Sequence, residues 1–395
     1  MINILLTCAG RRNYLVNYFR RALAGRGLVL AGDAAPSAPA LQEADLAFPL
    51  PPVTAPDYLE ILLSICRKYQ VRLLFSLNDL ELPLLSRHRS RFLEIGVIPV
   101  IPSPAVVDLC FDKWATGRFL QKIGLATPKT FLRLDEAQTA LRKGEIALPL
   151  VIKPRWGTAS LGIEYPESSE ELALAYRLSR LRLQRSCLAA ASAADPEHPL
   201  LIQEKLAGIE YGLDVVNNLN GEYVTTFVKQ KLAMRSGETD KAVTVHHPVL
   251  EELGRCLGKA LGHIGNLDCD VFVSEDRCWV LEMNPRFGGG YPFSHIAGAD
   301  VPAACIAWAL GAAVDPRWLA LKPAIATAKC DRLVEVGPKK TLQAGIMEID
   351  SAAHSSPGEK TSREPPTAPG RKIHWRKLLR NPEGKRKNDV TPRNP

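Results

Sequence analysis

The first 79 residues alternate between short apolar runs and amphipathic segments, and this order restricts the fold more than any other feature of the chain. The apolar runs have the length and residue types of buried strands, and the segments between them have the spacing of amphipathic helices. The expected strands are 2–8, 27–33 and 71–79, and the expected helices are 11–23 and 57–69. This order predicts an α/β domain in which helices cover both faces of a parallel sheet.

The first turn of this domain argues against one common ligand. It contains a single glycine, Gly10, whereas a dinucleotide-binding loop needs several, so NAD binding is not expected. Arg11, Asp33 and Asp79 stand near the carboxyl ends of the expected strands. They line a substrate cleft in one interpretation, and they cap helices or form turns in the other.

The cysteine content and the N-terminal sequence indicate the cellular compartment. The chain has 9 Cys residues, an odd number, and no CxxC pair, which indicates reduced thiols rather than a disulfide framework or a zinc site. The N-terminus lacks the basic region of a signal peptide, and the apolar run from Val301 to Val314 is too short to cross a bilayer. We therefore expect a cytoplasmic enzyme without a membrane span.

Residues 338–395 differ in composition from the rest of the chain. They hold 13 Lys and Arg against 6 Asp and Glu, and so carry most of the net charge of +8. Pro, Ser, Thr, Glu and Lys are frequent here, which predicts a basic, disordered C-terminal tail. Residues 371–380 have the pattern of a short basic amphipathic helix, so contact with a polyanion or a membrane surface is the alternative to a solvated tail.

The pattern of the chain changes near residue 110. Several prolines, a helix that carries Lys113, and then Gly124 and Pro128 indicate a domain junction. Beyond it, strands and helices follow without strict alternation, which predicts α+β subdomains rather than one doubly wound sheet. The expected strands lie within 148–163, 200–218, 222–234, 269–273 and 278–284, and a helix is expected at 249–265.

Two apolar segments within residues 268–284 predict a β-hairpin through the sequence SEDR. Because side chains of a strand alternate between its faces, Glu282 and Asn284 point to the same side. Asp270 precedes Glu282 by twelve residues, a separation that a hairpin converts into neighbours; Asp268 has the same parity and is the alternative. Carboxylate and amide oxygens are hard ligands, so the hairpin predicts a Mg²⁺ site.

Lys153 ends an apolar strand and directly precedes the small-residue loop RWGTASLG. Backbone N–H groups of such a loop and the hydroxyls of Thr158 and Ser160 are suited to phosphate oxygens. Further positive charge is expected from a second loop region, with Lys229, Lys231, Arg235 and Lys241.

The other end of a nucleotide has candidates as well. Glu204, Lys205 and Leu206 offer the backbone of a strand-to-loop transition to an adenine edge, and Glu210 is placed to accept hydrogen bonds from ribose hydroxyls.

Four segments occur in a fixed order: FDKWATGRFLQKIGLATP, PLVIKPRWGTASLG, IQEKLAGIEYGLD and DCDVFVSEDRCWVLEMNPRFGGGYP. Together they resemble the ATP-grasp superfamily, most closely its single-copy members similar to the large subunit of carbamoyl phosphate synthase. This resemblance implies a Rossmann-like pre-ATP-grasp domain at 1–110 and an ATP-grasp fold after it. The fold comprises a small subdomain with a linker helix at 111–195 and a C-terminal subdomain at 196–337, before the tail.

The resemblance also implies roles for the nucleotide-binding residues. Lys113 and Lys153 match the two lysines that bind ATP phosphates. The segment Glu204, Lys205 and Leu206 matches the adenine-binding segment, and Glu210 matches the ribose-binding glutamate.

For metal binding and catalysis, Asp270, Glu282 and Asn284 match the Mg²⁺ ligands of the family. Arg286 matches the arginine that faces the reacting phosphoryl or carboxylate group, and we group Lys241 with it as a catalytic residue. The cofactors implied are ATP and Mg²⁺, with Mn²⁺ as the alternative metal.

The implied reaction is that of a carboxylate–amine ligase. A small-molecule carboxylate is phosphorylated and then joined to an amine or another nucleophile, with release of ADP and phosphate; a homodimer is one option for the assembly. The chain has one grasp module and no recognisable glutaminase domain, so carbamoyl phosphate synthesis itself is not expected. The alternatives are a nucleotide-binding regulator without turnover and an interaction protein that acts through the basic tail.

Overall fold

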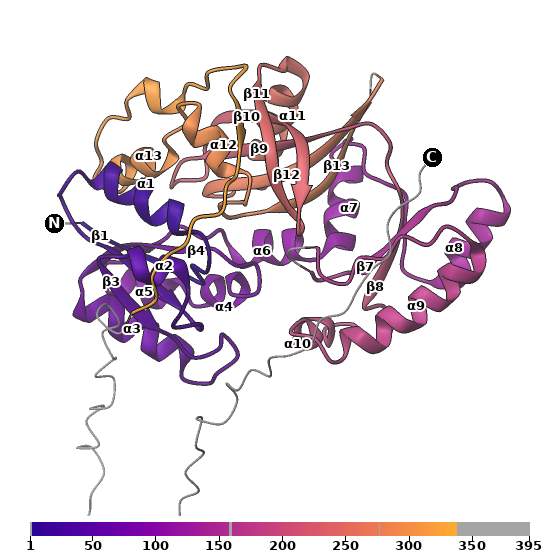
Figure 1. Cartoon of the computed structure of the whole chain (residues 1–395), viewed down its shortest axis with the longest axis horizontal. Coiled ribbons are helices and arrows are strands. Elements are labelled where there is room, and N and C mark those ends of the chain that lie inside the picture. Colours follow the sequence, from indigo (N-terminus) through magenta and orange to yellow (C-terminus); the bar gives the residue numbers. More distant parts are fainter. Residues whose placement is uncertain (1, 158–159, 276, 338–395) are drawn as a thin grey trace, which may run out of the picture. The chain divides into compact units, whose positions relative to one another are not determined.

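The computed structural model describes residues 2–157, 160–275 and 277–337. Its N-terminal part contains the predicted parallel sheet, with five strands in the order β3-β2-β1-β4-β5 (Figure 1). The strands are β1 (Asn3–Thr7), β2 (Val29–Asp33), β3 (Leu46–Pro49), β4 (Val71–Ser76) and β5 (Ile98–Pro99). The three strands expected from the sequence form the centre of this sheet, and β3 and β5 extend it at its edges.

Helices cover both faces of this sheet, as predicted. Ile4 and Leu6 of β1 belong to one apolar core, whereas Leu5 belongs to the core on the other face, as the alternation of side chains along a strand requires. The helices are α1 (Asn13–Leu23), α2 (Pro39–Glu43), α3 (Tyr58–Lys68), α4 (Leu82–Arg87) and α5 (Arg89–Glu94).

A buried carboxylate fastens the carboxyl ends of β1 and β4. Glu81 accepts hydrogen bonds from the hydroxyls of Thr7 at 2.7 Å, Tyr58 at 2.6 Å and Ser76 at 2.6 Å. The thiol of Cys8 is a further partner, so all the partners are protein groups; because the side chain is also fully buried, Glu81 serves the fold and is not open to a ligand.

The small subdomain begins after α6 (Pro104–Phe111) and α7 (Lys113–Lys122). Its antiparallel sheet has the order β6-β8-β7, and α9 packs on β7 and β8 (Figure 1). Its elements are β6 (Thr130–Phe131), α8 (Leu134–Arg142), β7 (Leu150–Pro154), α9 (Ser169–Leu183), α10 (Ala189–Ser192) and β8 (Leu200–Glu204). The sheet therefore takes a strand from beyond residue 195, where we expected the subdomain to end, because β7 and β6 need β8 as their shared neighbour.

The large sheet is antiparallel and has the order β13-β12-β9-β10-β11-β14. Leu250, Leu253 and Leu257 of α11 pack against its apolar face. The elements are β9 (Ile209–Asn217), β10 (Tyr223–Arg235), β11 (Glu238–Val245), α11 (Pro248–Leu261), β12 (Gly265–Ser274), β13 (Arg277–Asn284) and β14 (Ala326–Ala328). The predicted helix ends earlier than expected because Gly262 adopts a left-handed conformation and caps it.

The strand expected within 222–234 is β10, which contains Lys229, Lys231 and Arg235. Lys241 lies on the next strand, β11, so the four basic residues do not form the second loop region that we expected. Ser236 and Gly237 connect the strands, both with positive φ, as a two-residue hairpin requires.

The last elements return to the N-terminal domain. After α12 (Tyr291–Ile296), helix α13 (Val301–Ala309) packs on α1, and the 3-10 helix η1 (Pro316–Leu319) follows. Phe287 and Tyr291 share one apolar core with Phe19 and Phe75. The N-terminal domain and the large sheet are thus joined by a common core, which holds the loop after β13 in place.

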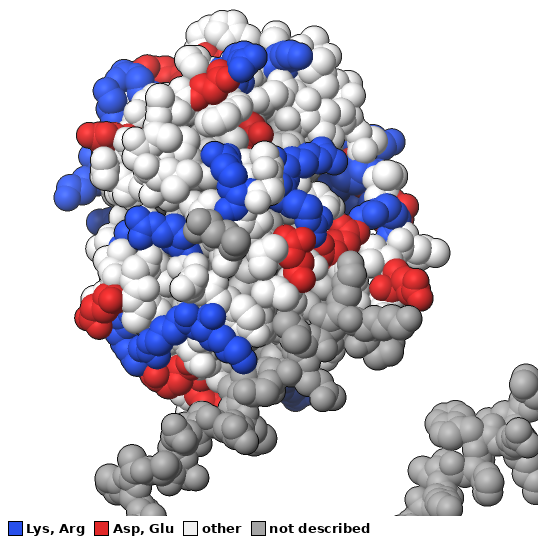
Figure 2. Space-filling view, turned by 90° about the vertical axis from the view of Figure 1, so that its left-hand side faces the viewer, with Lys and Arg blue, Asp and Glu red and all other residues white. Residues whose placement is uncertain are grey.

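No helix in the described ranges is long and apolar enough to cross a membrane. Figure 2 shows Lys and Arg side chains in bands across one face, with Asp and Glu side chains beside them. The charge on this face is therefore locally mixed. The predicted disordered tail, residues 338–395, lies outside the described residues.

The buried His263 gives the folded protein a specific response to acid. Burial lowers its pKa to about 4, although the hydrogen bond between its Nε2 and the carbonyl of Val215, at 3.0 Å, acts to raise the pKa. Because the unfolded chain protonates its histidines near pH 6.5, the stability due to neutral His263 is present above that pH and is lost as pH falls toward 4.

We expect this residue to lower the free energy of unfolding by about 2 kcal/mol between pH 7 and pH 5. Chemical denaturation at both pH values checks this, with His263→Gln as the matched variant because its amide still donates to Val215 but does not titrate. Equal pH dependence in the two proteins would contradict the assignment.

Candidate active site

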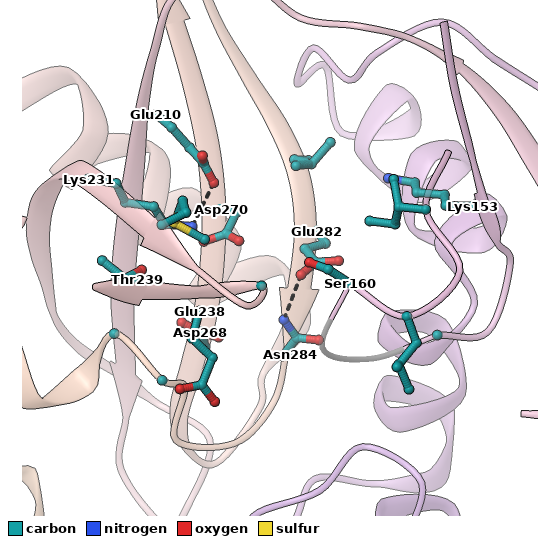
Figure 3. A pocket seen from close by; sticks show the side chains of 18 of the residues that line it. Lys153, Ser160, Glu210, Lys231, Glu238, Thr239, Asp268, Asp270, Glu282 and Asn284 are labelled. Atoms are coloured by element: carbon teal, nitrogen blue, oxygen red, sulfur yellow. Dashed lines mark hydrogen bonds and ion pairs between the residues drawn. The ribbon is translucent and has the colours of Figure 1, made fainter. Parts of the chain in front are cut away.

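A cavity of about 420 Å³ lies between the small sheet and the large sheet. Lys153 of β7 and Lys113 of α7 line one side, and the strands β9 to β13 line the other. Figure 3 shows Lys153 across from Glu282, with Glu210 on the far wall. Arg12, from the first turn of the N-terminal domain, completes the lining, so all three parts of the described chain contribute to one site.

The hairpin β12–β13 brings the predicted metal ligands together in register. Asp270 pairs with Glu282 across the two strands, and Asp268 pairs with Asn284. The amide of Asn284 donates to Glu282 at 3.4 Å (Figure 3). This part of the prediction follows from strand periodicity, and the register places the donors on one wall of the cavity.

Asp270 and Glu282 have pKa values shifted in opposite directions. Burial and the nearby carboxylates of Asp268 and Glu282 raise the pKa of Asp270 to about 7, although Lys231 opposes the shift. Burial also acts on Glu282, but the ammonium groups of Lys113 and Lys153 outweigh it and lower the pKa of that carboxyl. The lysines on the opposite wall therefore hold Glu282 in its ionised form.

Lys231 links two predicted ligand groups. Its Nζ lies 2.7 Å from a carboxylate oxygen of Glu210 and 2.7 Å from one of Asp270 (Figure 3). The sequence suggested only general positive charge here. The signal that was available is the spacing of Lys229 and Lys231, two residues apart, which places both side chains on one face of β10.

Lys113 and Lys153 provide the positive wall. Lys113 donates to the carbonyl of Gly157 at 2.7 Å and lies 3.6 Å from Glu282. Lys153 is 4% exposed and has no carboxylate within ion-pair distance among the described residues. Burial and the charge of Lys113 lower its pKa to about 8. A buried cation without an ion pair is suited to an anionic ligand.

The predicted nucleotide residues are only partly assembled around the cavity. Ser160 and Glu210 line it, while Thr158 lies outside the described residues. Glu204 ends β8, and Lys205 and Leu206 follow it; none of the three is among the lining residues, and the Glu204 carboxylate accepts a hydrogen bond from the backbone N–H of Lys129 at 2.7 Å. Their role in adenine binding stays a prediction.

Arg286 lies at the junction with the N-terminal domain, and its side chain is 7% exposed. It donates to Asp79 at 2.7 Å and to Asp268 at 3.2 Å, and its Nε has no hydrogen-bond partner in the described chain. Asp268, the alternative metal ligand, is thus engaged by Arg286, whereas Asp270 is engaged by Lys231. Arg286 lines the cavity, as its predicted catalytic role requires.

Lys241 is placed differently from the prediction. It is exposed on β11 and does not line the cavity. The period of two alone would place Lys241 on the same face as Thr239, which lines the cavity, but the register of β10 and β11 shifts between these two residues. We therefore do not retain Lys241 as a catalytic residue.

Gly288, Gly289 and Gly290 lie so close to neighbouring side chains that a larger residue at any of them would clash. A Cβ on Gly288 would lie 2.1 Å from the carboxyl carbon of Asp268, and a Cβ on Gly289 would lie 3.0 Å from that of Glu238. A Cβ on Gly290 would lie 2.8 Å from Lys229. The structure shows that these glycines make room for side chains from three strands, β12, β11 and β10.

Arg12 and Glu238 line the cavity but were not predicted as site residues. Arg12 donates to the carbonyl of Phe287 at 2.7 Å, although 275 positions separate the two residues. No local pattern marks such a contact, because it depends on the packing of the first turn against the loop after β13.

The oxygen donors on the hairpin fit a hard divalent cation in kind. Asp270, Glu282 and Asn284 offer two carboxylates and one amide on one wall. No group of three or more His, Cys, Asp or Glu side chains in the described ranges is arranged to hold a metal ion. Asp270 is instead paired with Lys231, so metal binding requires that ion pair to rearrange.

Comparisons with known proteins agree with this architecture. The family model for the PylC-like N-terminal domain matches residues 4–101, and the model for ATP-grasp in the biosynthetic pathway with Ter operon matches residues 196–331. The carbamoyl phosphate synthase large chain of Mycobacterium sp. (strain JLS) is 25% identical over 233 residues, which are 56% of this chain and 20% of that protein. This chain thus spans about a fifth of the length of such relatives.

Solved structures share the fold. A biotin carboxylase complex from Campylobacter jejuni superposes with a TM-score of 0.63 at 16% identity, over 81% of this chain and 74% of that one. An L-amino acid ligase from Bacillus licheniformis gives 0.57 at 16% identity, over 78% and 74% of the two chains. N5-carboxyaminoimidazole ribonucleotide synthetase from Thermotoga maritima also gives 0.57 at 16% identity, over 80% and 77%.

Proposed function

We propose that this chain, which contains an ATP-grasp domain, uses ATP to phosphorylate a carboxylate and then joins the acyl group to an amine or another nucleophile. One observation carries the proposal. The cavity sets the buried Lys153 and the half-buried Lys113 opposite the ionised carboxylate of Glu282, with Asp270 and Asn284 beside it. Cations for phosphate groups and oxygen donors for a divalent ion thus face one another across a space of ligand size.

The residues divide the work of phosphoryl transfer. Lys113 and Lys153 bind the phosphates of ATP and offset their charge, and Glu210 binds the ribose once Lys231 releases it. Asp270, Glu282 and Asn284 would hold Mg²⁺, or Mn²⁺ in its place, and Asp268 is the alternative to Asp270. When bound, such an ion neutralises charge on the phosphate oxygens.

Arg286 acts at the acid substrate. A carboxylate oxygen attacks the γ-phosphorus, the bond from that phosphorus to the bridging oxygen breaks, and ADP leaves with the electron pair. Arg286 is fixed by Asp79 and Asp268, and its guanidinium lines the cavity, so it orients the carboxylate without a change of rotamer. An amine then attacks the acyl carbon, and phosphate leaves.

The proposal predicts ADP release that depends on an added acid. We expect the full chain with ATP and Mg²⁺ to release ADP slowly alone and at least about tenfold faster with its own carboxylate, because the acid supplies the missing nucleophile. A coupled ADP assay across a panel of carboxylic acids measures this. Equal ADP release with every acid and with none would count against the proposed function.

A further inference from the structure

Two charged residues on the cavity wall nearest the N-terminal domain, Arg12 and Glu238, have side-chain atoms without a hydrogen-bond partner in the described chain. Arg12 lines the cavity and donates one hydrogen bond, to the carbonyl of Phe287, and no carboxylate of the described chain lies within ion-pair distance of it. Among the cavity's cations it shares this property only with Lys153, as far as the described ranges show. Lys153 lies with the phosphate-binding residues, so Arg12 remains for a different anionic group.

Glu238 is the matching anion. Its side chain is 36% exposed, whereas the other carboxylates of the cavity, which pair with Lys113, Lys231 or Arg286, are 15–30% exposed. One oxygen accepts a hydrogen bond from Lys329 at 3.1 Å, and the other has no partner among the described residues. Burial acts to raise the pKa of Glu238, but Lys329, Arg12 and Arg11 outweigh it and lower the pKa, so the group is ionised at neutral pH.

The loop after β13 holds this pair in place. The carboxyl group of Glu238 lies against Gly289, where even a Cβ would come within 3.0 Å of it, and Arg12 is bonded to Phe287 of the same loop. Figure 3 shows Glu238 beside Asp268 and away from Lys153. The guanidinium of Arg12 and the carboxylate of Glu238, which both contact this loop, therefore present opposite charges on one wall of the cavity.

We propose that this wall selects an amino acid as the acid to be activated, with Glu238 binding its ammonium group and Arg12 its carboxylate. The inference rests on the proposed function and adds the substrate class. The ammonium group of an amino acid supplies a cation to the Glu238 oxygen that Lys329 does not reach, whereas an acid without an amino group supplies none, and a second carboxylate in its place is repelled. An amino acid satisfies both charges and directs its carboxylate to the γ-phosphate.

The test compares acids in matched pairs. Each protein amino acid is assayed beside the acid that lacks only its α-amino group, such as alanine with propanoate and glutamate with glutarate, by ADP release from the full chain with ATP and Mg²⁺. We expect one or more amino acids to stimulate release, with kcat/KM at least about 100-fold above that of the matched acid. Equal stimulation by the matched acids would overturn the inference and leave the proposed function standing. Failure of every acid in both halves would count against both.

Substitutions test whether Glu238 causes the preference for amino acids. Glu238→Gln should raise the KM for the amino acid about 10- to 100-fold, because it removes a charge-assisted hydrogen bond, while ATP affinity by calorimetry stays unchanged. It should also reduce the preference over the matched acid. Lys329→Met removes the ion pair but keeps the carboxylate, so it separates a structural role of the pair from ligand binding, and Glu170→Gln on exposed α9 is the matched surface control. Retained preference in Glu238→Gln, or equal loss in Lys329→Met, would overturn the assignment.

Discussion

Lys153→Met should weaken ATP binding at least about 100-fold and leave the fold intact. The native ammonium is buried and has no ion pair in the described chain, and its pKa of about 8 reflects the cost of that burial and the nearby Lys113. ATP phosphates would supply the counter-charge that the protein does not. Methionine has a similar length and no charge, so it fills the space and removes a buried cation.

The Lys153→Met substitution should lower the affinity for ATP but not the stability of the folded protein, so a binding defect can be told apart from a folding defect. Calorimetry with ATP should show the loss of affinity, while the melting temperature without nucleotide should stay the same or rise. Lys259→Met, on an exposed position of α11, is the matched control. Unchanged ATP affinity in a folded Lys153→Met protein would remove this residue from the site.

Gly288→Ala should lower kcat by about 100-fold with little change in ATP affinity. The new Cβ would lie 2.1–2.3 Å from three atoms of the Asp268 carboxyl group, so that group must move. Asp268 accepts a hydrogen bond from Arg286, and its displacement frees the guanidinium to turn away from the acid substrate. A substitution that adds one methyl group thus acts on the arginine through the aspartate.

A double-mutant cycle tests that route. If Gly288→Ala acts by displacing Asp268, then combining it with Asp268→Ala should cost little more than Asp268→Ala alone. Gly117→Ala on α7 is the control, because its nearest neighbour beyond the helix is 3.8 Å away. Independent, additive losses in the cycle would show that Gly288 acts in another way.

The parts of the fold that the sequence predicted are those set by local periodicity. The alternating residues Ile4, Leu5 and Leu6 belong to opposite faces of the parallel sheet, and Glu282 and Asn284 share one face of β13. In both cases a strand period of two is enough to assign side chains to faces. The hairpin through residues 274–277 was also predicted, because it joins neighbours in sequence.

The parts that were missed depend on contacts between distant segments. Lys231 meets Asp270 only because β9 lies between β10 and β12, an order that no local pattern states. Arg12 reaches the loop after β13 through the core that α1 shares with Phe287. Lys241 was assigned from charge alone, and charge does not distinguish a strand position on the cavity wall from an exposed one.

The identity of the nucleotide product tests the central claim most directly. Activation of a carboxylate by γ-phosphoryl transfer releases ADP, whereas activation by adenylation releases AMP and pyrophosphate. With ATP, Mg²⁺, the stimulating acid and hydroxylamine in place of the natural amine, we expect phosphorus NMR to show ADP and phosphate in equal amounts, with a matching amount of hydroxamate trapped from the acyl phosphate. AMP and pyrophosphate as the products would contradict the account.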